Sequence, residues 1–249
     1  MCIRNRDAFA GSVAIAGGAI AGSAAGAGVE VTNQLATKIE AYADASNLTA
    51  TLGNIEIQAV SDSQITKAHA TGVAVALSLA PSGFAISIAA SIVENVINNT
   101  VSAYIKGNDS EQITAGGNVS IIANAEHAKI SDTSALTASV SGGLVGAAGG
   151  GVNISSIIDN TINASLNGPL IVTATGNLVV TTHENASVEA ESKGVTASFS
   201  IGAAVGVSIV ENVINSTITA TIANTVAHAG DVTVSATSVA NIIKTRSLV

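Results

Sequence analysis

The octapeptide SIVENVIN occurs twice in this chain, at residues 91–98 and again at 208–215. A string of eight residues is not repeated by chance in a chain of 249, so we predict that the protein is built from copies of one unit. Two further tracts align with this pair. The tracts are VEVTNQLATKIEAYA from 29, SIVENVINNTVSAYI from 91, VNISSIIDNTINASL from 152 and SIVENVINSTITATI from 208, and they begin 62, 61 and 56 residues apart.

Each tract alternates with a period of two, which is the signature of a half-buried β-strand. In the second copy, Val93, Ile97 and Val101 share one face with Asn95 and Asn99, and the opposite face is polar and differs from copy to copy. The helical period of 3.6 does not reproduce this pattern. We therefore expect strands whose equivalent faces stack from copy to copy.

Two columns on the inward face are polar. The first is Asn33, Asn95, Ser156 and Asn212; the second is Thr37, Asn99, Asn160 and Ser216. If copies stack about 4.8 Å apart, like amides can hydrogen-bond from one copy to the next and satisfy one another, as in a ladder. The alternative is that these residues lie at turns, where Asn and Asp are common; the unbroken alternation favours the ladder.

A second marker, Gly-Asn/Asp followed by an apolar residue, comes after each tract. It predicts a tight corner leading into another strand, with positive φ at the glycines. These corner glycines are Gly53, Gly117, Gly176 and Gly230. A β-hairpin has the same local signature, so the sequence leaves hairpin and solenoid corner open.

An uncharged run precedes each tract, at 8–29, 71–93, 133–158 and 194–210. One face of each run is tiny, which predicts the close approach of an opposing sheet, and the other face is often apolar and must be covered or left exposed. The first run loosely imitates a signal peptide, but it occupies the place of the other runs and is expected to belong to the first copy. As helices, three of the runs could span a bilayer. The lack of an aromatic belt or basic flanks disfavours that alternative.

The sequence offers no motif for chemistry. We find no nucleotide loop, GxSxG, HExxH, CxxC or calcium repeat, so no catalytic, cofactor-binding or metal-binding residue is predicted. The four histidines are not equivalent between copies, and Glu184, Glu189 and Glu191 are expected on a solvated face. A single cysteine, Cys2, excludes an intramolecular disulfide, and a net charge of −8 without a basic cluster argues against nucleic acid.

The uncharged Gly/Ala/Val runs, the VxNxIxNxT tracts and the GNVSI corners resemble repeats of large bacterial surface proteins. These are the filamentous-haemagglutinin-like adhesins and the passenger regions of autotransporters. The resemblance covers nearly the whole chain and implies a parallel β-solenoid, secretion, and adhesion or surface structure. It assigns no functional residue, because the shared pattern is structural.

We therefore expect an all-β fold, a parallel β-solenoid (β-helix) of four repeats of about 60 residues, with one wide coil or two narrower coils per repeat. The chain is one repeat domain, 1–249, with copies at 8–70, 71–133, 134–194 and 195–249. Aromatic residues are only 2% of the chain, which suits a thin stack of strands.

The expected function is a non-enzymatic structural or adhesive module of a bacterial cell-surface or secreted protein, located outside the cell or on its surface. Its expected partners are surface glycans or proteins of host or neighbouring cells, together with other copies in end-to-end or lateral association. No cofactor is expected. The alternatives are a membrane-inserting protein that uses the uncharged runs and a polysaccharide-active β-helix enzyme.

Overall fold

The computed structural model describes residues 2–248, without the side chain of Ser200, and every regular element in this range is a β-strand. The strands are β1 (Cys2–Ala16), β2 (Gly22–Asp44), β3 (Leu48–Ala50), β4 (Ile55–Ser78), β5 (Phe84–Lys106), β6 (Gln112–Ala115), β7 (Val119–Ile158), β8 (Thr161–Ala174), β9 (Leu178–Ile214), β10 (Thr217–His228) and β11 (Val232–Leu248). All strand pairings within residues 2–248 are parallel, which confirms the predicted all-β solenoid and excludes hairpins in this range.

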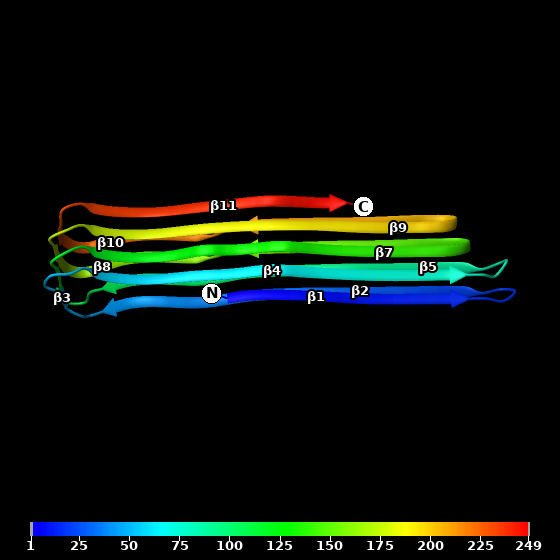
Figure 1. Cartoon of the computed structure of the whole chain (residues 1–249), viewed down its shortest axis with the longest axis horizontal. Coiled ribbons are helices and arrows are strands. Elements are labelled where there is room, and N and C mark those ends of the chain that lie inside the picture. Colours follow the sequence, from blue (N-terminus) through cyan, green and yellow to red (C-terminus); the bar gives the residue numbers. More distant parts are fainter. Residues whose placement is uncertain (1, 249) are drawn as a thin grey trace.

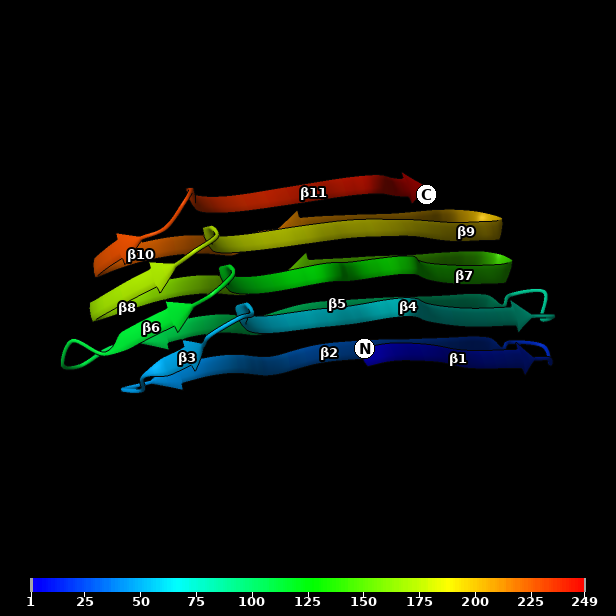
Figure 2. The ribbon, with the colours of Figure 1, turned by 60° about the vertical axis from the view of Figure 1, so that its left-hand side comes forward.

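Three stacks of strands build the molecule (Figures 1 and 2). The front sheet contains β1, β4, the first part of β7 (119–142), the first part of β9 (178–199) and β11. The back sheet contains β2, β5, the later part of β7 with the start of β8, and the later part of β9 with the start of β10. A short third sheet contains β3, β6 and the ends of β8 and β10.

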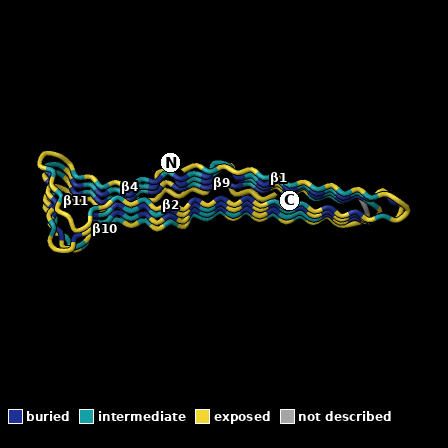
Figure 3. The backbone as a smooth tube through the Cα atoms, turned by 90° about the horizontal axis from the view of Figure 1, so that it is seen from below, coloured by how far each residue is buried: buried dark blue, intermediate teal, exposed yellow. Residues whose placement is uncertain are grey.

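Each copy forms one wide coil, which settles the choice between one coil and two. The chain runs along the back sheet, crosses the third sheet and returns along the front sheet, so that Asn33 lies beside Asn95 and Asn95 beside Ser156. Seen along the stack, the molecule is a long thin blade that closes to a point at one end and widens at the third sheet (Figure 3).

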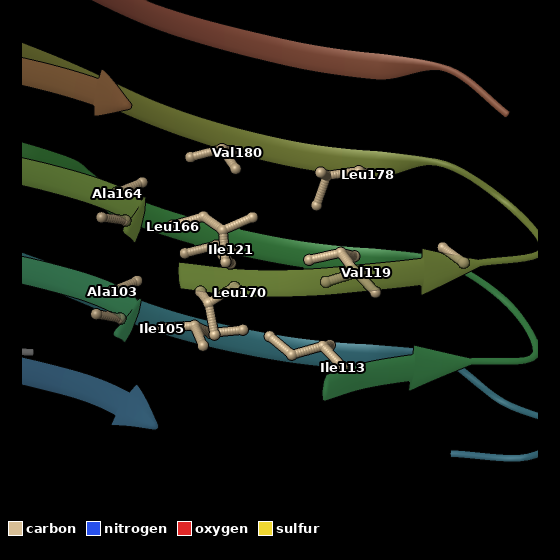
Figure 4. Packing of buried hydrophobic residues seen from close by; sticks show 14 of the residues in the cluster. Ala103, Ile105, Ile113, Val119, Ile121, Ala164, Leu166, Leu170, Leu178 and Val180 are labelled. Carbon is tan, nitrogen blue, oxygen red and sulfur yellow. The ribbon is translucent and has the colours of Figure 1, made fainter. Parts of the chain in front are cut away.

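The interior changes in character along the blade. Beside the third sheet, large residues such as Ile105, Ile121 and Leu166 pack into one fully buried cluster (Figure 4). At the narrow end the corresponding cluster consists of alanines, among them Ala74 and Ala85. Because side chains fill the space between two sheets, the change from isoleucine to alanine explains why the blade tapers.

Small residues bring the two sheets close together in the narrow half. Ser91 Oγ donates to the carbonyl of Leu136 at 2.8 Å, and the hydroxyls of Ser87 and Ser139 lie 2.7 Å apart. A Cβ added to Gly72 would stand 2.9 Å from the carbonyl oxygen of Ala90 in the opposing sheet. The uncharged runs therefore fold as strands whose small inward side chains permit this approach.

The membrane alternative in its helical form is wrong, because residues 8–29, 71–93, 133–158 and 194–210 contain strands and no helix. Across the described residues no helix is long and apolar enough to cross a membrane.

We predict that Gly72→Ala destabilises the protein by about 1–3 kcal/mol, because the added methyl group overlaps opposing backbone that cannot easily move. The measurement is the free energy of unfolding in urea, followed by circular dichroism. Gly17→Ala is the control, since nothing lies within 4 Å of a Cβ added there. A Gly72→Ala protein as stable as the control protein would contradict the close approach of the sheets.

Candidate functional site

The first inner column stacks in register, each member beside the next. Its members are Asn33, Asn95, Ser156 and Asn212. Asn33 Nδ2 donates to Asn95 Oδ1 at 3.0 Å, but the next amide turns across the blade, and Asn95 Nδ2 donates to Thr133 Oγ1 of the front sheet at 3.0 Å. Asn212 likewise reaches Thr245 Oγ1 of the front sheet at 2.8 Å. A bond between like amides thus forms at one step only, and the column also ties the back sheet to the front sheet.

In the second inner column the side chains bond to main chain instead. The N–H of Thr37 donates to Asn99 Oδ1 at 3.1 Å, and the N–H of Asn99 donates to Asn160 Oδ1 at 3.0 Å. The N–H of Asn160 donates to Ser216 Oγ at 3.3 Å. Asn160 and Ser216 lie where the back strand is interrupted, between β7 and β8 and between β9 and β10. Each of these side chains therefore accepts a main-chain N–H of the preceding coil, in the continuous strands as well as at the break.

The four corner glycines lie in the connections that lead into β4, β7, β9 and β11. The predicted positive φ is wrong, because among the described residues only Gly18 and Gly168 are glycines with positive φ. The physical need is for space. A Cβ on Gly117 would lie 2.2 Å from Asn54 Oδ1, and one on Gly176 would lie 2.1 Å from Asn118 Oδ1.

The corner carries the regular side-chain ladder that was expected in the strands. Asn54 Oδ1 accepts the N–H of Asn118 at 2.8 Å, and Asn118 Oδ1 accepts the N–H of Asn177 at 2.9 Å. Asn177 Oδ1 accepts the N–H of Asp231 at 3.0 Å. The repeated Gly-Asn pairs were the available signal. Each asparagine bonds to the next coil, and Gly117, Gly176 and Gly230 leave room for the asparagine of the previous coil.

Glu184 corrects the expectation of a solvated acidic face. Its side chain is fully buried inside the blade, where Oε1 accepts Asn160 Nδ2 at 2.9 Å and Oε2 accepts Ser238 Oγ at 3.1 Å. A buried carboxylate is tolerated when hydrogen bonds satisfy it, as here. Glu184 therefore joins the break in the back sheet to β11 of the front sheet.

The outer face of the front sheet carries the densest group of ionisable side chains. Lys67 Nζ lies 2.7 Å from Asp7 Oδ2, and this bond raises the pKa of Lys67 above its ordinary value. His69 contacts Asp7 through Nδ1 at 3.4 Å and Asp132 through Nε2 at 3.0 Å. Ser134 is beside His69 in the sheet, and both ring nitrogens of His69 lie near carboxylates.

Glu191 is the second centre of this charged group. Its carboxylate lies 2.5 Å from Lys244 Nζ, 3.2 Å from Lys193 Nζ and 3.6 Å from Arg246 Nη1. Hydrogen bonds from Lys244 and then Lys193 lower the pKa of Glu191 to about 2. The carboxylate is thus held ionised as a counter-ion, which is unlike the raised pKa that a general acid needs.

The charged group borders two hollows, one beside Asp7 and Lys67 and a more enclosed one of about 230 Å³ between His69 and Glu191. Within the described residues no group of three His, Cys, Asp or Glu side chains could hold a metal ion. The hollow beside Asp7, Lys67 and His69 has a volume of about 350 Å³ and is open to solvent.

Exposed apolar side chains dominate the narrow half of the blade on both faces. On the front sheet, Phe9 and Phe199 are 72% and 75% exposed, with Val13, Ile15 and Val195 also exposed nearby. On the back sheet, Ile88 and Ile201 are 60% and 79% exposed. The sequence predicted that the apolar face of the uncharged runs is either covered by another layer or left exposed. In this structure it is exposed.

Comparison with known protein families, curated proteins and solved structures finds no match to this chain. Function must therefore be argued from the geometry of the blade.

We predict that Gly176→Ala and Asn118→Ala are strongly non-additive. Gly176→Ala alone is expected to cost about 1–3 kcal/mol, because its methyl group meets Asn118 Oδ1. Asn118→Ala alone is expected to cost about 1 kcal/mol through the lost bond to Asn177. In the double variant the overlap with the amide is gone, so the two effects should fall short of their sum in a double-mutant cycle of urea unfolding.

The control for the corner is Gly53→Ala, because nothing lies within 4 Å of its added Cβ. If the effects of the two substitutions were additive, glycine would not be needed at the corner to make room for the asparagine side chain.

Glu191 also predicts a dependence of stability on pH. Its folded-state pKa of about 2 is below the ordinary 4.5, so its stabilisation is present above the ordinary value and is lost as the pH falls toward 2. Glu191→Gln should remove this part of the acid destabilisation in urea unfolding measured from neutral to acidic pH. A Glu191→Gln profile identical to that of the parent would refute the role of Glu191.

Proposed function

We propose that this chain is a non-enzymatic structural and adhesive module of a bacterial cell-surface or secreted protein. Its blade holds a flat apolar surface outward, and adhesion takes place at the narrow half of the front sheet. The observation that carries the proposal is the exposure of Phe9, Val13 and Phe199 on a regular sheet, within runs that have no charged residue. Exposed apolar areas of this kind typically mark interaction sites.

The frame suits a structural role. Side-chain ladders at the corners and main-chain ladders in three sheets join each coil to its neighbours, so the surface rests on rigid elements. A rigid surface loses little conformational entropy when it binds. Stiffness and flatness are properties that adhesion to an extended surface requires.

The chemistry of the front face favours apolar partners. Aliphatic and phenyl groups offer no hydrogen bonds to the hydroxyls of a glycan, whereas their burial against another apolar surface is favourable. We therefore place an apolar protein or matrix surface ahead of glycans among the partners. A location outside the cell is part of this proposal and rests on the resemblance to surface adhesins.

An enzyme is the weaker candidate, because the most concentrated acids are occupied. Asp7 and Asp132 face Lys67 and His69, and Glu191 is surrounded by cations. A glycosidase needs one carboxyl group that is protonated near neutral pH, and Glu191 has the opposite property.

The test is adsorption of the purified chain to methyl-terminated and hydroxyl-terminated monolayers, measured with a quartz microbalance. We expect retention on the methyl surface. Val13→Lys with Phe199→Lys should weaken retention at least about tenfold. The variant lacks two apolar side chains that would be buried against the methyl surface, and its two new charges would have to be desolvated there.

The matched control is Ser120→Lys with Asn124→Lys, which adds the same charge to the polar half of the same sheet. Equal loss in both double variants would indicate a general charge effect and contradict the proposal. Selective binding on a glycan array, or release of reducing sugars from polysaccharides, would replace it with the glycan-binding or enzymatic alternative.

A further inference from the structure

Large and small side chains alternate from coil to coil on the narrow half of the back face. The outward residues of the second coil are large, including Phe84, Ile86 and Ile88, and those of the fourth include Ile201, Val205 and Val207. The first and third coils present mainly glycine and alanine in the same columns. Two apolar ridges thus alternate with two furrows, and one hollow of about 250 Å³ lies in the furrow at Gly151. The front face shows no such alternation.

Except at Gly22, where the ring of Phe84 occupies the space of an added Cβ, the chain's own packing does not require the furrow glycines. Around Gly26, Gly28 and Gly151 nothing lies within 4 Å of an added Cβ, and at Gly149 the nearest atom is at 3.9 Å, an ordinary contact. Glycine weakens a strand interior, and where its own fold does not need it, it often marks the close approach of another backbone. These glycines therefore point to an external partner whose side chains enter the furrows.

A second copy supplies such a partner through one particular symmetry. A two-fold axis parallel to the strands, between the second and third coils, places the first coil opposite the fourth and the second opposite the third. Ridge residues then meet furrow glycines in the middle columns, where Val205 faces Gly26 of the other copy and Ile88 faces Gly149. At the tip of the blade Phe84 faces Val145. A two-fold axis along the stack would instead set ridge against ridge.

Charge agrees with the same axis. At the border of the apolar half, Glu30 would face Ile209, Glu94 would face Ser155 and Glu211 would face Thr32 of the other copy. No two carboxylates oppose one another. With the two-fold axis along the stack, each coil would face the same coil of the other copy, so each carboxylate would lie at the same level as its counterpart.

We propose that two copies of this chain pair through the narrow halves of their back faces, with ridges in furrows. Four coils at about 4.8 Å and nine residues at about 3.3 Å give a face of roughly 570 Å². The pair would therefore bury about 1,100 Å² in total, at the lower end for a specific dimer. Both front faces stay outward, so the pairing does not rest on the adhesive role proposed above.

The first test fills the furrows with Gly26→Val and Gly149→Val. Both positions accept a Cβ within one chain, and valine favours strands, so the variant should fold; circular dichroism of the monomer checks this. Sedimentation velocity over a concentration series should show a monomer–dimer equilibrium for the parent and at least about tenfold weaker association for the variant. Ala138→Val, on the front face of the same half, is the control and should associate like the parent.

The second test fixes the symmetry by cross-linking. In a Cys2→Ser background, Ala24→Cys and Ala203→Cys lie three coils apart in one chain, about 14 Å, and cannot form a disulfide within it. Across the proposed axis they face each other twice, at about the 10 Å spacing of packed sheets. A bismaleimide too short to span about 14 Å should therefore give a closed dimer in which residue 24 is linked to residue 203.

Several outcomes would overturn the pairing. A parent that stays monomeric throughout the series excludes it, as does a furrow-filled variant that dimerises like the parent. Cross-links joining 24 to 24 indicate the other axis, and a ladder of polymers indicates end-to-end stacking. Because adhesion is measured on the front face, loss of methyl-surface binding with pairing intact would refute only the proposed function.

Discussion

The registration of equivalent residues from one coil to the next is the constraint on which this structure depends. Parallel strands about 4.8 Å apart leave each side chain directly above its counterpart, so every column must be filled by groups that tolerate their own kind. Ile97 and Ile158 satisfy this by packing, and Asn54 and Asn118 by bonding to the next main chain. The copies differ freely only where a column faces solvent.

Much of the fold could be predicted because the inward and outward residues alternate with a period of two and align between the copies. The alignment of SIVENVIN with its relatives places Asn33, Asn95, Ser156 and Asn212 in one column, as the strand pairing has them. The corner glycines were also located by alignment. The physical reason for glycine at these positions was not predicted correctly. Positive φ was expected from the local sequence, whereas the need for space arises from a neighbouring coil about 60 residues away.

Other features depend on contacts between the two sheets, which periodicity does not report. Glu184 occupies an inward position, but its partners Asn160 and Ser238 come from different coils and faces, so sequence alone gave no reason to bury a carboxylate there. Asn95 turns toward Thr133 for the same reason. The ridges and furrows emerged only from the strand register, and they acquire meaning because Gly26 and Gly149 are unconstrained by their own chain.

The geometry of the coils has a mechanical consequence. Each coil holds about 60 residues, or roughly 200 Å of extended chain, within about 4.8 Å of height. Because a coil contacts only its neighbours, tension along the stack would detach coils one at a time from an end. Each coil that detaches would extend from about 4.8 Å of stack height to roughly 200 Å of chain, a gain of some forty-fold. The blade can therefore act as an extensible tether that yields in steps.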